Sequence, residues 1–196
     1  MKNSIFKTVS LFSTALLLLT FASCKKDDKT PAPVEQELIT TVRLRFTDTA
    51  DKQTALFYTY KVENGFNNTT PGTIRIDTIR LSAGKTYRVE TDLFNDKAVS
   101  ADRTLEEIFR ERDQHLFLYI SDPASGPGTV NPIPGTGITD FQNKPFNQEI
   151  EMAAAGSGSS KLRVLLIHEP TNKAAQTPEA AGGETDVDVT FPVIVK

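Results

Sequence analysis

The segment TTVRLRFTD, residues 40–48, alternates apolar and polar side chains with a period of two residues. Val42, Leu44 and Phe46 fall on one face of such a segment, and the two arginines between them fall on the other. This alternation is typical of a β-strand with one buried and one solvated face. The segment therefore predicts a sheet that covers a core with one of its faces.

The same alternation recurs along the chain, with turn residues between the repeats. We expect the turn SAGK, residues 82–85, to join two of these strands as a hairpin. About eight strands at this spacing predict one all-β domain over 38–196: an antiparallel β-sandwich, immunoglobulin-like or transthyretin-like, with a closed barrel as the alternative. The further strands are expected at 56–62, 74–76, 79–81, 87–93, 116–120, 148–152, 162–168 and 187–195.

One segment departs from the strand pattern. DRTLEEIFRERDQ, residues 102–114, places its apolar residues at helical spacing, and Thr104 with Glu107 has the form of a capping box. We expect one short amphipathic helix here. Two long loops rich in glycine and proline are expected at 121–137 and 172–183. Binding loops commonly sit on rigid scaffolds, so these two loops are the predicted contact surfaces.

The first 23 residues have the pattern of an export signal, with Lys2 and Lys7 ahead of an apolar run that ends in small residues. The run is short for a membrane span, so we expect removal of 1–23 by a cut before Cys24. Cleavage would leave 173 residues and change the formal charge from −3 to −5. This acidic balance argues against nucleic acid as a partner, because nucleic-acid-binding proteins carry a basic face.

The residues around the cut carry a resemblance to a known class. Phe21-Ala22-Ser23-Cys24 is similar to the lipobox of bacterial lipoproteins, although Phe21 stands where leucine is usual. The resemblance implies that the Cys24 thiol receives a diacylglycerol and becomes the new N-terminus. Such a lipid anchor would leave no thiol for a disulfide or a cysteine metal site in the mature monomer.

The residues after the cysteine extend the resemblance. Lys25, Lys26, Asp27 and Asp28 look like the lysine and acidic export signal of Bacteroidota surface lipoproteins. The resemblance implies a protein anchored by lipid in the outer membrane and exposed at the cell surface. Residues 24–37 hold charge, two prolines and few apolar side chains, so we expect the lipidated cysteine to be followed by an extended tether.

A second resemblance lies in the C-terminal half. The segments RDQHLFLY (112–119), LLIHEP (165–170) and GGETDVDVTFPV (182–193) look like parts of uncharacterised Bacteroidota lipoproteins. This resemblance bears on class and compartment and implies no activity.

Two histidines offer the one candidate for site chemistry. His115 and His168 each lie at the end of a predicted strand, and Glu111 precedes His115 by four residues. If the strand ends converge, two imidazoles and the Glu111 carboxylate could ligate zinc or a related divalent ion. The alternative is that each histidine packs or caps at its strand end without a metal.

Other polar clusters predict ordinary surface. In GGETDVDV, residues 182–189, the three acidic side chains alternate with other residues and are expected on the solvated face of a strand. A sugar site has little support, because the chain has no tryptophan, and Tyr119 and Phe66 are the candidate stacking platforms.

These features favour a non-enzymatic, lipid-anchored protein that acts as a binding or accessory subunit of an uptake or surface assembly. Its partners would be the membrane, through the anchor, and an outer-membrane transporter or surface assembly. The alternative is a small-ligand or metal-binding lipoprotein that uses His115, His168 and Glu111. A polysaccharide or peptide hydrolase is the weakest hypothesis, because the sequence contains no recognisable catalytic set and predicts no other cofactor.

Overall fold

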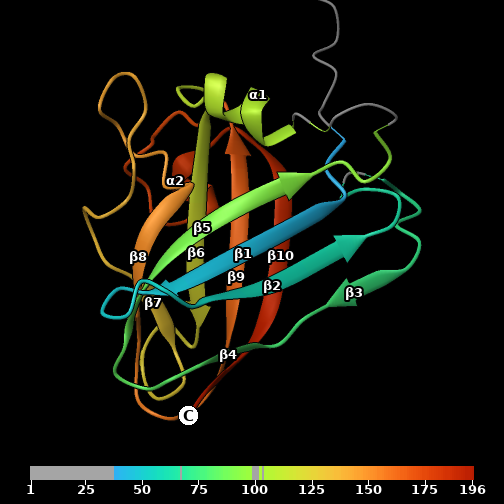
Figure 1. The fold of residues 1–196 in the computed structure, drawn as a ribbon. Coiled ribbons are helices and arrows are strands. Elements are labelled where there is room, and N and C mark those ends of the chain that lie inside the picture. Colours follow the sequence, from blue (N-terminus) through green and yellow to red (C-terminus); the bar gives the residue numbers. More distant parts are fainter. Residues whose placement is uncertain (1–37, 67, 99–101, 103) are drawn as a thin grey trace, which may run out of the picture. The chain divides into compact units, whose positions relative to one another are not determined.

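The computed structural model describes residues 38–66, 68–98, 102 and 104–196. Within these residues the chain forms two sheets packed face to face, so the predicted all-β sandwich is confirmed, and the closed barrel is not what forms. The six-stranded sheet lies in front of the four-stranded sheet in Figure 1. Neither helix in the described part of the chain is long and apolar enough to cross a membrane.

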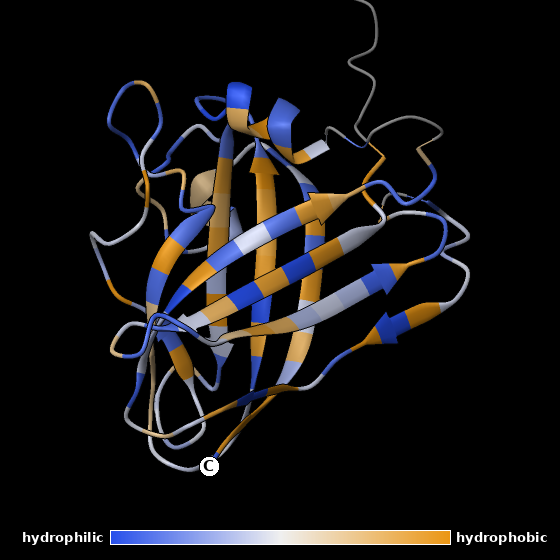
Figure 2. Ribbon diagram, in the orientation of Figure 1, coloured by the Kyte–Doolittle hydropathy of each residue, from blue (hydrophilic) through white to orange (hydrophobic). Residues whose placement is uncertain are grey.

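The six-stranded sheet has the order β3-β2-β1-β5-β8-β7, and every neighbouring pair in it is antiparallel. Figure 2 shows the alternation of hydrophilic and hydrophobic residues along β1 and β5 that the sequence predicts. The strands are β1 (Thr41–Asp48), β2 (Ala55–Val62), β3 (Ile74–Ile76), β5 (Thr86–Phe94), β7 (Val130–Pro132) and β8 (Glu149–Ala154).

The four-stranded sheet has the order β4-β10-β9-β6. Its strands are β4 (Ile79–Leu81), β6 (His115–Asp122), β9 (Gly158–His168) and β10 (Glu184–Val195). β10 pairs antiparallel with β9 along its length and parallel with β4 over its last three residues. The sheet is therefore mixed, and the C-terminal strand holds β4 in place.

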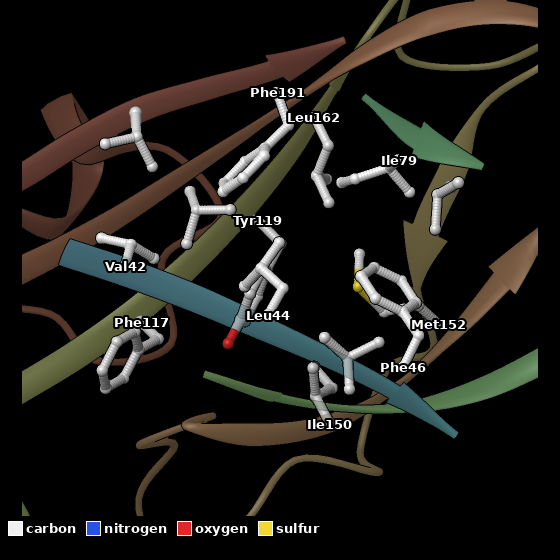
Figure 3. Packing of buried hydrophobic residues seen from close by; sticks show 14 of the residues in the cluster. Val42, Leu44, Phe46, Ile79, Phe117, Tyr119, Ile150, Met152, Leu162 and Phe191 are labelled. Atoms are coloured by element: carbon white, nitrogen blue, oxygen red, sulfur yellow. The ribbon is translucent and has the colours of Figure 1, made fainter. Parts of the chain in front are cut away.

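The main core lies between the two sheets. Val42, Leu44 and Phe46 of β1 are fully buried there and face side chains such as Leu162 and Phe191 from the opposite sheet, as Figure 3 shows. The arginines that alternate with them on β1 point to the outer face, where they form ion pairs with β5. The face assignment made from the 40–48 segment is confirmed.

The predicted hairpin at 82–85 is wrong. β4 and β5 follow one another in the sequence, but β4 belongs to the four-stranded sheet and β5 to the six-stranded sheet. The turn carries the chain from one layer of the sandwich to the other, and Gly84 adopts a positive φ of 70° there. Short-range turn residues produce the reversal without determining which sheet the next strand joins.

The helix predicted over 102–114 forms as α1 (Thr104–Arg110) and buries Ile108 at one end of the sandwich (Figure 1). The two predicted loops contain short elements of their own. β7 lies within 121–137, and a single helical turn, α2 (Pro178–Ala181), lies within 172–183. Thr177 caps α2, since its hydroxyl accepts a hydrogen bond from the Ala180 amide.

α2 covers a second, smaller apolar cluster on the outer face of the four-stranded sheet. This end of the sheet is thus buried on both faces, which explains the continuous apolar runs in β6 and β9. The cluster contains Leu116, Leu118, Leu165, Ile167 and Ala181.

Candidate metal centre

The two histidines predicted as metal ligands are brought together by strand pairing. His115 is the first residue of β6 and His168 the last residue of β9, and the two are direct cross-strand partners. Their side chains lie on the face that meets the opposite sheet, at the α1 end. The imidazole rings stack with centroids 4.8 Å apart and an angle of 9° between their planes. Both rings therefore present nitrogen atoms to the same small region.

Asp186 of β10 is the third member of the group. The ligand atoms of His115, His168 and Asp186 lie within 4.8 Å of one another, and no other such group occurs among the residues that the structure describes. Asp186 is only 8% exposed. Its position depends on an irregularity in β10, where the pairing with β9 shifts between Thr185 and Val187 and leaves Asp186 as the extra residue.

This β-bulge overturns the prediction that all three acids of GGETDVDV lie on a solvated strand face. Glu184 and Asp188 are exposed as predicted, but the extra residue turns the Asp186 side chain inward. The preceding glycines allow the approach. Gly183 has a φ of 78°, and a Cβ there would overlap the main-chain oxygen of His168. A larger residue would push the start of β10 away from the end of β9.

Glu111 contributes through its main chain rather than through its carboxylate. Its carbonyl oxygen lies 3.0 Å from Nδ1 of His115. A carbonyl oxygen can only accept, so His115 carries its hydrogen on Nδ1 and keeps the lone pair on Nε2. The Glu111 carboxylate is not a member of the group formed by the two histidines and Asp186. A carbonyl that fixes the tautomer of a histidine is the usual outer partner of a metal-ligating imidazole.

The electrostatics of the site favour neutral His115. Burial lowers the pKa of His115 below its ordinary value of 6.5, although the hydrogen bond to the Glu111 carbonyl opposes this shift. The neighbouring His168 lowers the pKa further, whereas the Asp186 carboxylate raises it. At neutral pH the Nε2 lone pair is therefore available to a cation.

The donor set is two imidazoles and one carboxylate. Three N and O ligands with a further position for water are typical of open zinc sites, and imidazole also suits Cu, Fe and Ni. Ca²⁺ and Mg²⁺ prefer sites made of oxygen alone. The group thus fits a divalent transition metal, and binding of an ion stays a prediction.

The two long loops also come together, at the β6 edge of the sandwich. A cavity of about 230 Å³ lies between them, lined by apolar residues such as Ile133 and Pro134 from one loop and Ala174 and Ala175 from the other. This convergence was not foreseen, because loop sequences carry no information about which loops become neighbours.

A third segment, the turn at 140–144, lies beside the two loops and presents an aromatic side chain. The turn at 140–144 exposes 62% of Phe141, and the Arg112 guanidinium lies 3.5 Å from the centre of its ring. Asp140 at the base of the turn binds Lys173 of the second loop. The ring is therefore exposed and held at the same time.

The remaining predicted sites, the lipidation site Cys24 and the export signal Lys25, Lys26, Asp27 and Asp28, lie outside the described residues. Nothing in the fold bears on them. No family model, curated protein or solved structure matches the chain.

Proposed function

We propose that the protein is a lipid-anchored binding protein that holds a divalent transition-metal ion, of the zinc class, at His115, His168 and Asp186. The observation that carries the proposal is the convergence of these three side chains from three adjacent strands. A regular β10 would leave the carboxylate outside, so the bulge and the glycines before it serve this arrangement.

The bond from His115 to the Glu111 carbonyl supports the same function. It orients the ring and leaves Nε2 for the ion, and Glu111 is held in turn by the chain that follows α1. His168 is half-buried, so water has access to the site from its side of the pair. A resident ion with one open position could also take a small anionic or N-donor ligand.

The test is a thermal-unfolding series of the full chain in non-ionic detergent, with Zn²⁺, Ni²⁺, Co²⁺, Mg²⁺ and Ca²⁺ added separately. An ion that binds only the native state stabilises it by about 2.7 kcal/mol at a hundredfold excess over Kd. For a domain of this size we expect Zn²⁺ to raise Tm by about 5–10 °C. Mg²⁺ and Ca²⁺ should leave it unchanged.

Three variants locate the site. His168→Gln and Asp186→Asn should abolish the Zn²⁺-induced rise in Tm. Glu184→Gln is the matched control, because Glu184 lies on the same strand and opposite His168 but is exposed. A rise that persists in both site variants, or a wild-type Tm that no transition metal moves, contradicts the metal function.

The anchor is part of the proposal and has its own test. We propose that Cys24 carries the lipid, that Lys25, Lys26, Asp27 and Asp28 direct the protein to the outer surface of a Bacteroidota outer membrane, and that 24–37 form the tether. Metabolic labelling with an alkyne fatty acid should tag the wild type and not Cys24→Ala. Protease shaving of intact cells should then remove the domain, because we propose that it faces outward. A domain that survives shaving would contradict the outward orientation.

We propose as a second function that the protein is an accessory subunit of an uptake or surface assembly. The convergence of the two loops beside Phe141, whose ring contacts Arg112, favours it, since aromatic residues and arginine are enriched in protein interfaces. A crosslinked pull-down from the native outer membrane should recover one stoichiometric partner, and Phe141→Ala should weaken that recovery. Phe57→Ala, which removes an exposed ring on another face, is the control.

A further inference from the structure

The outer face of the six-stranded sheet carries a polar groove that the metal site does not use. The groove has a volume of about 600 Å³ and crosses β1, β5 and β8. The turn at 48–52 forms one wall, and Thr136 of the first long loop forms the other. Figure 2 shows hydrophilic residues alternating with hydrophobic ones along β1 and β5, two of the strands that the groove crosses.

The floor of the groove is a row of opposite charges held in place by strand pairing. Arg45 and Glu90 are cross-strand partners whose side chains form an ion pair at 3.0 Å. Arg88 of β5 forms a diagonal ion pair with Glu149 of β8, since its direct cross-strand partner is Glu151. A guanidinium group donates hydrogen bonds in a planar fork, and a carboxylate accepts them in a similar fork. A hydroxyl group both donates and accepts, so the floor offers a partner for each role.

The charges nearly cancel. The groove is lined by three cationic side chains, four carboxylate side chains and three threonines. A surface with little net charge does not attract a polyanion or a polycation over a neutral ligand. The lining therefore fits a neutral ligand rich in hydroxyl groups.

Two polar atoms in this floor lack partners. Nε of Arg45 and Oγ1 of Thr47 are screened from solvent and have no hydrogen-bond partner in the described part of the chain. Unsatisfied buried groups are rare in native proteins. A ligand that draws these two side chains outward would supply the missing bonds.

An exposed aromatic ring continues the row. Phe57 of β2 is the cross-strand partner of Arg45, and its side chain is 53% exposed. The guanidinium of Arg43, also on β1, lies 5.5 Å from the centre of the same ring. Phe57, Arg45, Glu90 and Glu149 thus form one line across four strands.

We propose that this line, from Phe57 into the groove, is a binding site for a neutral polysaccharide chain. A pyranose ring has an apolar face that stacks on an aromatic ring and an edge of hydroxyl groups that bind forked donors and acceptors. The outer face of the six-stranded sheet offers both features along one line: first the aromatic ring of Phe57, then the charged side chains of the groove. The stacking platform is Phe57 and not the expected Tyr119, which is buried and binds Thr91 and Asn147.

The test is affinity electrophoresis of the full chain in non-ionic detergent, through native gels that contain dextran, laminarin, galactomannan or xyloglucan. Polygalacturonate and heparin are the anionic comparators. We expect retardation by at least one neutral polymer, and at least tenfold weaker binding for Phe57→Ala and for Glu90→Gln. EDTA should not change the retardation, which separates this site from the proposed metal centre.

Phe109→Ala is the matched control, because it removes a 43% exposed ring of α1 that does not line the groove. It should bind like the wild type. The proposal is overturned if none of the four neutral polymers retards the protein, if only the anionic polymers do, or if Phe57→Ala and Glu90→Gln both bind like the wild type. An equal loss in Phe109→Ala would also overturn it.

Discussion

Asp140 and Lys173 form an ion pair that is almost completely withdrawn from solvent. Oδ2 of Asp140 lies 2.8 Å from Nζ of Lys173, and the side chains are 1% and 6% exposed. Lys173 also donates to the main-chain oxygens of Arg112 and Asp113. The pair therefore ties the chain after α1, the turn that carries Phe141 and the second long loop to one point.

The first prediction concerns this pair. Asp140→Asn keeps the shape of the side chain but leaves the Lys173 ammonium buried without its counter-charge, so the free energy of unfolding should fall by about 3–5 kcal/mol. Urea unfolding at neutral pH measures the change. Asp188→Asn is the control, because it breaks the exposed pair with Arg163 and should cost less than about 1 kcal/mol. Equal losses in the two variants would contradict the special role of the buried pair.

The second prediction is a pH dependence. Burial by itself raises the pKa of Asp140, but the hydrogen bonds from Lys173 and from the amides of Lys144 and Gln142 outweigh it and hold the pKa below its ordinary value of 3.8. A carboxyl group with a lowered native pKa stabilises the fold above its unfolded pKa and loses that contribution as the pH falls through the native value. The wild type should therefore lose stability more steeply than Asp140→Asn below about pH 4. Urea unfolding between neutral and acidic pH checks this, and parallel curves would refute it.

The third prediction compares two glycines, Gly128 in the first long loop and Gly156 just before β9. Gly128 has a φ of 84°, and a Cβ on it would overlap the main chain of Gly158 and Ser159. Gly128→Ala should therefore lower the free energy of unfolding by about 2 kcal/mol or more. A Cβ on Gly156 would meet no atom within 4 Å, so Gly156→Ala should stay within about 0.5 kcal/mol of the wild type. Thermal unfolding compares them, and similar Tm values for the two variants would contradict the close approach.

The fourth prediction concerns the C-terminus. Removal of residues 193–196 deletes the buried Val193 and Val195 and the whole parallel partner of β4. Each valine contributes about 1.5–3 kcal/mol by burial, so the truncated chain should lose at least about 3 kcal/mol of stability. Circular dichroism during urea unfolding measures this. Lys196→Ala keeps the strand and should behave like the wild type.

Much of the fold is readable from the sequence because alternation reports which side of a strand is buried. The 40–48 segment and the strands at 56–62 and 87–93 form as predicted. Sheet membership is not readable in this way. The 82–85 turn looks like a hairpin, yet it joins two layers, because pairing depends on strands that are distant in the sequence.

The candidate site was only partly predictable. Strand ends at His115 and His168 could be located from periodicity, and the structure shows that they meet. Strict alternation along β10 places Asp186 on the solvated face, together with Glu184 and Asp188. The bulge interrupts that alternation at Asp186, so the sequence pattern alone does not identify it as a ligand. The available signal was the GG pair at 182–183, which allows a close approach before β10.

The parallel contact between β4 and β10 has a consequence for folding kinetics. Ile79 pairs with Val193, so β4 cannot take its place until the last strand of the chain is available. Contacts between residues so distant in sequence require closure of a very long loop, which slows folding and keeps apolar strands exposed meanwhile. The second layer should therefore close late in folding, once β10 is available to pair with both β9 and β4.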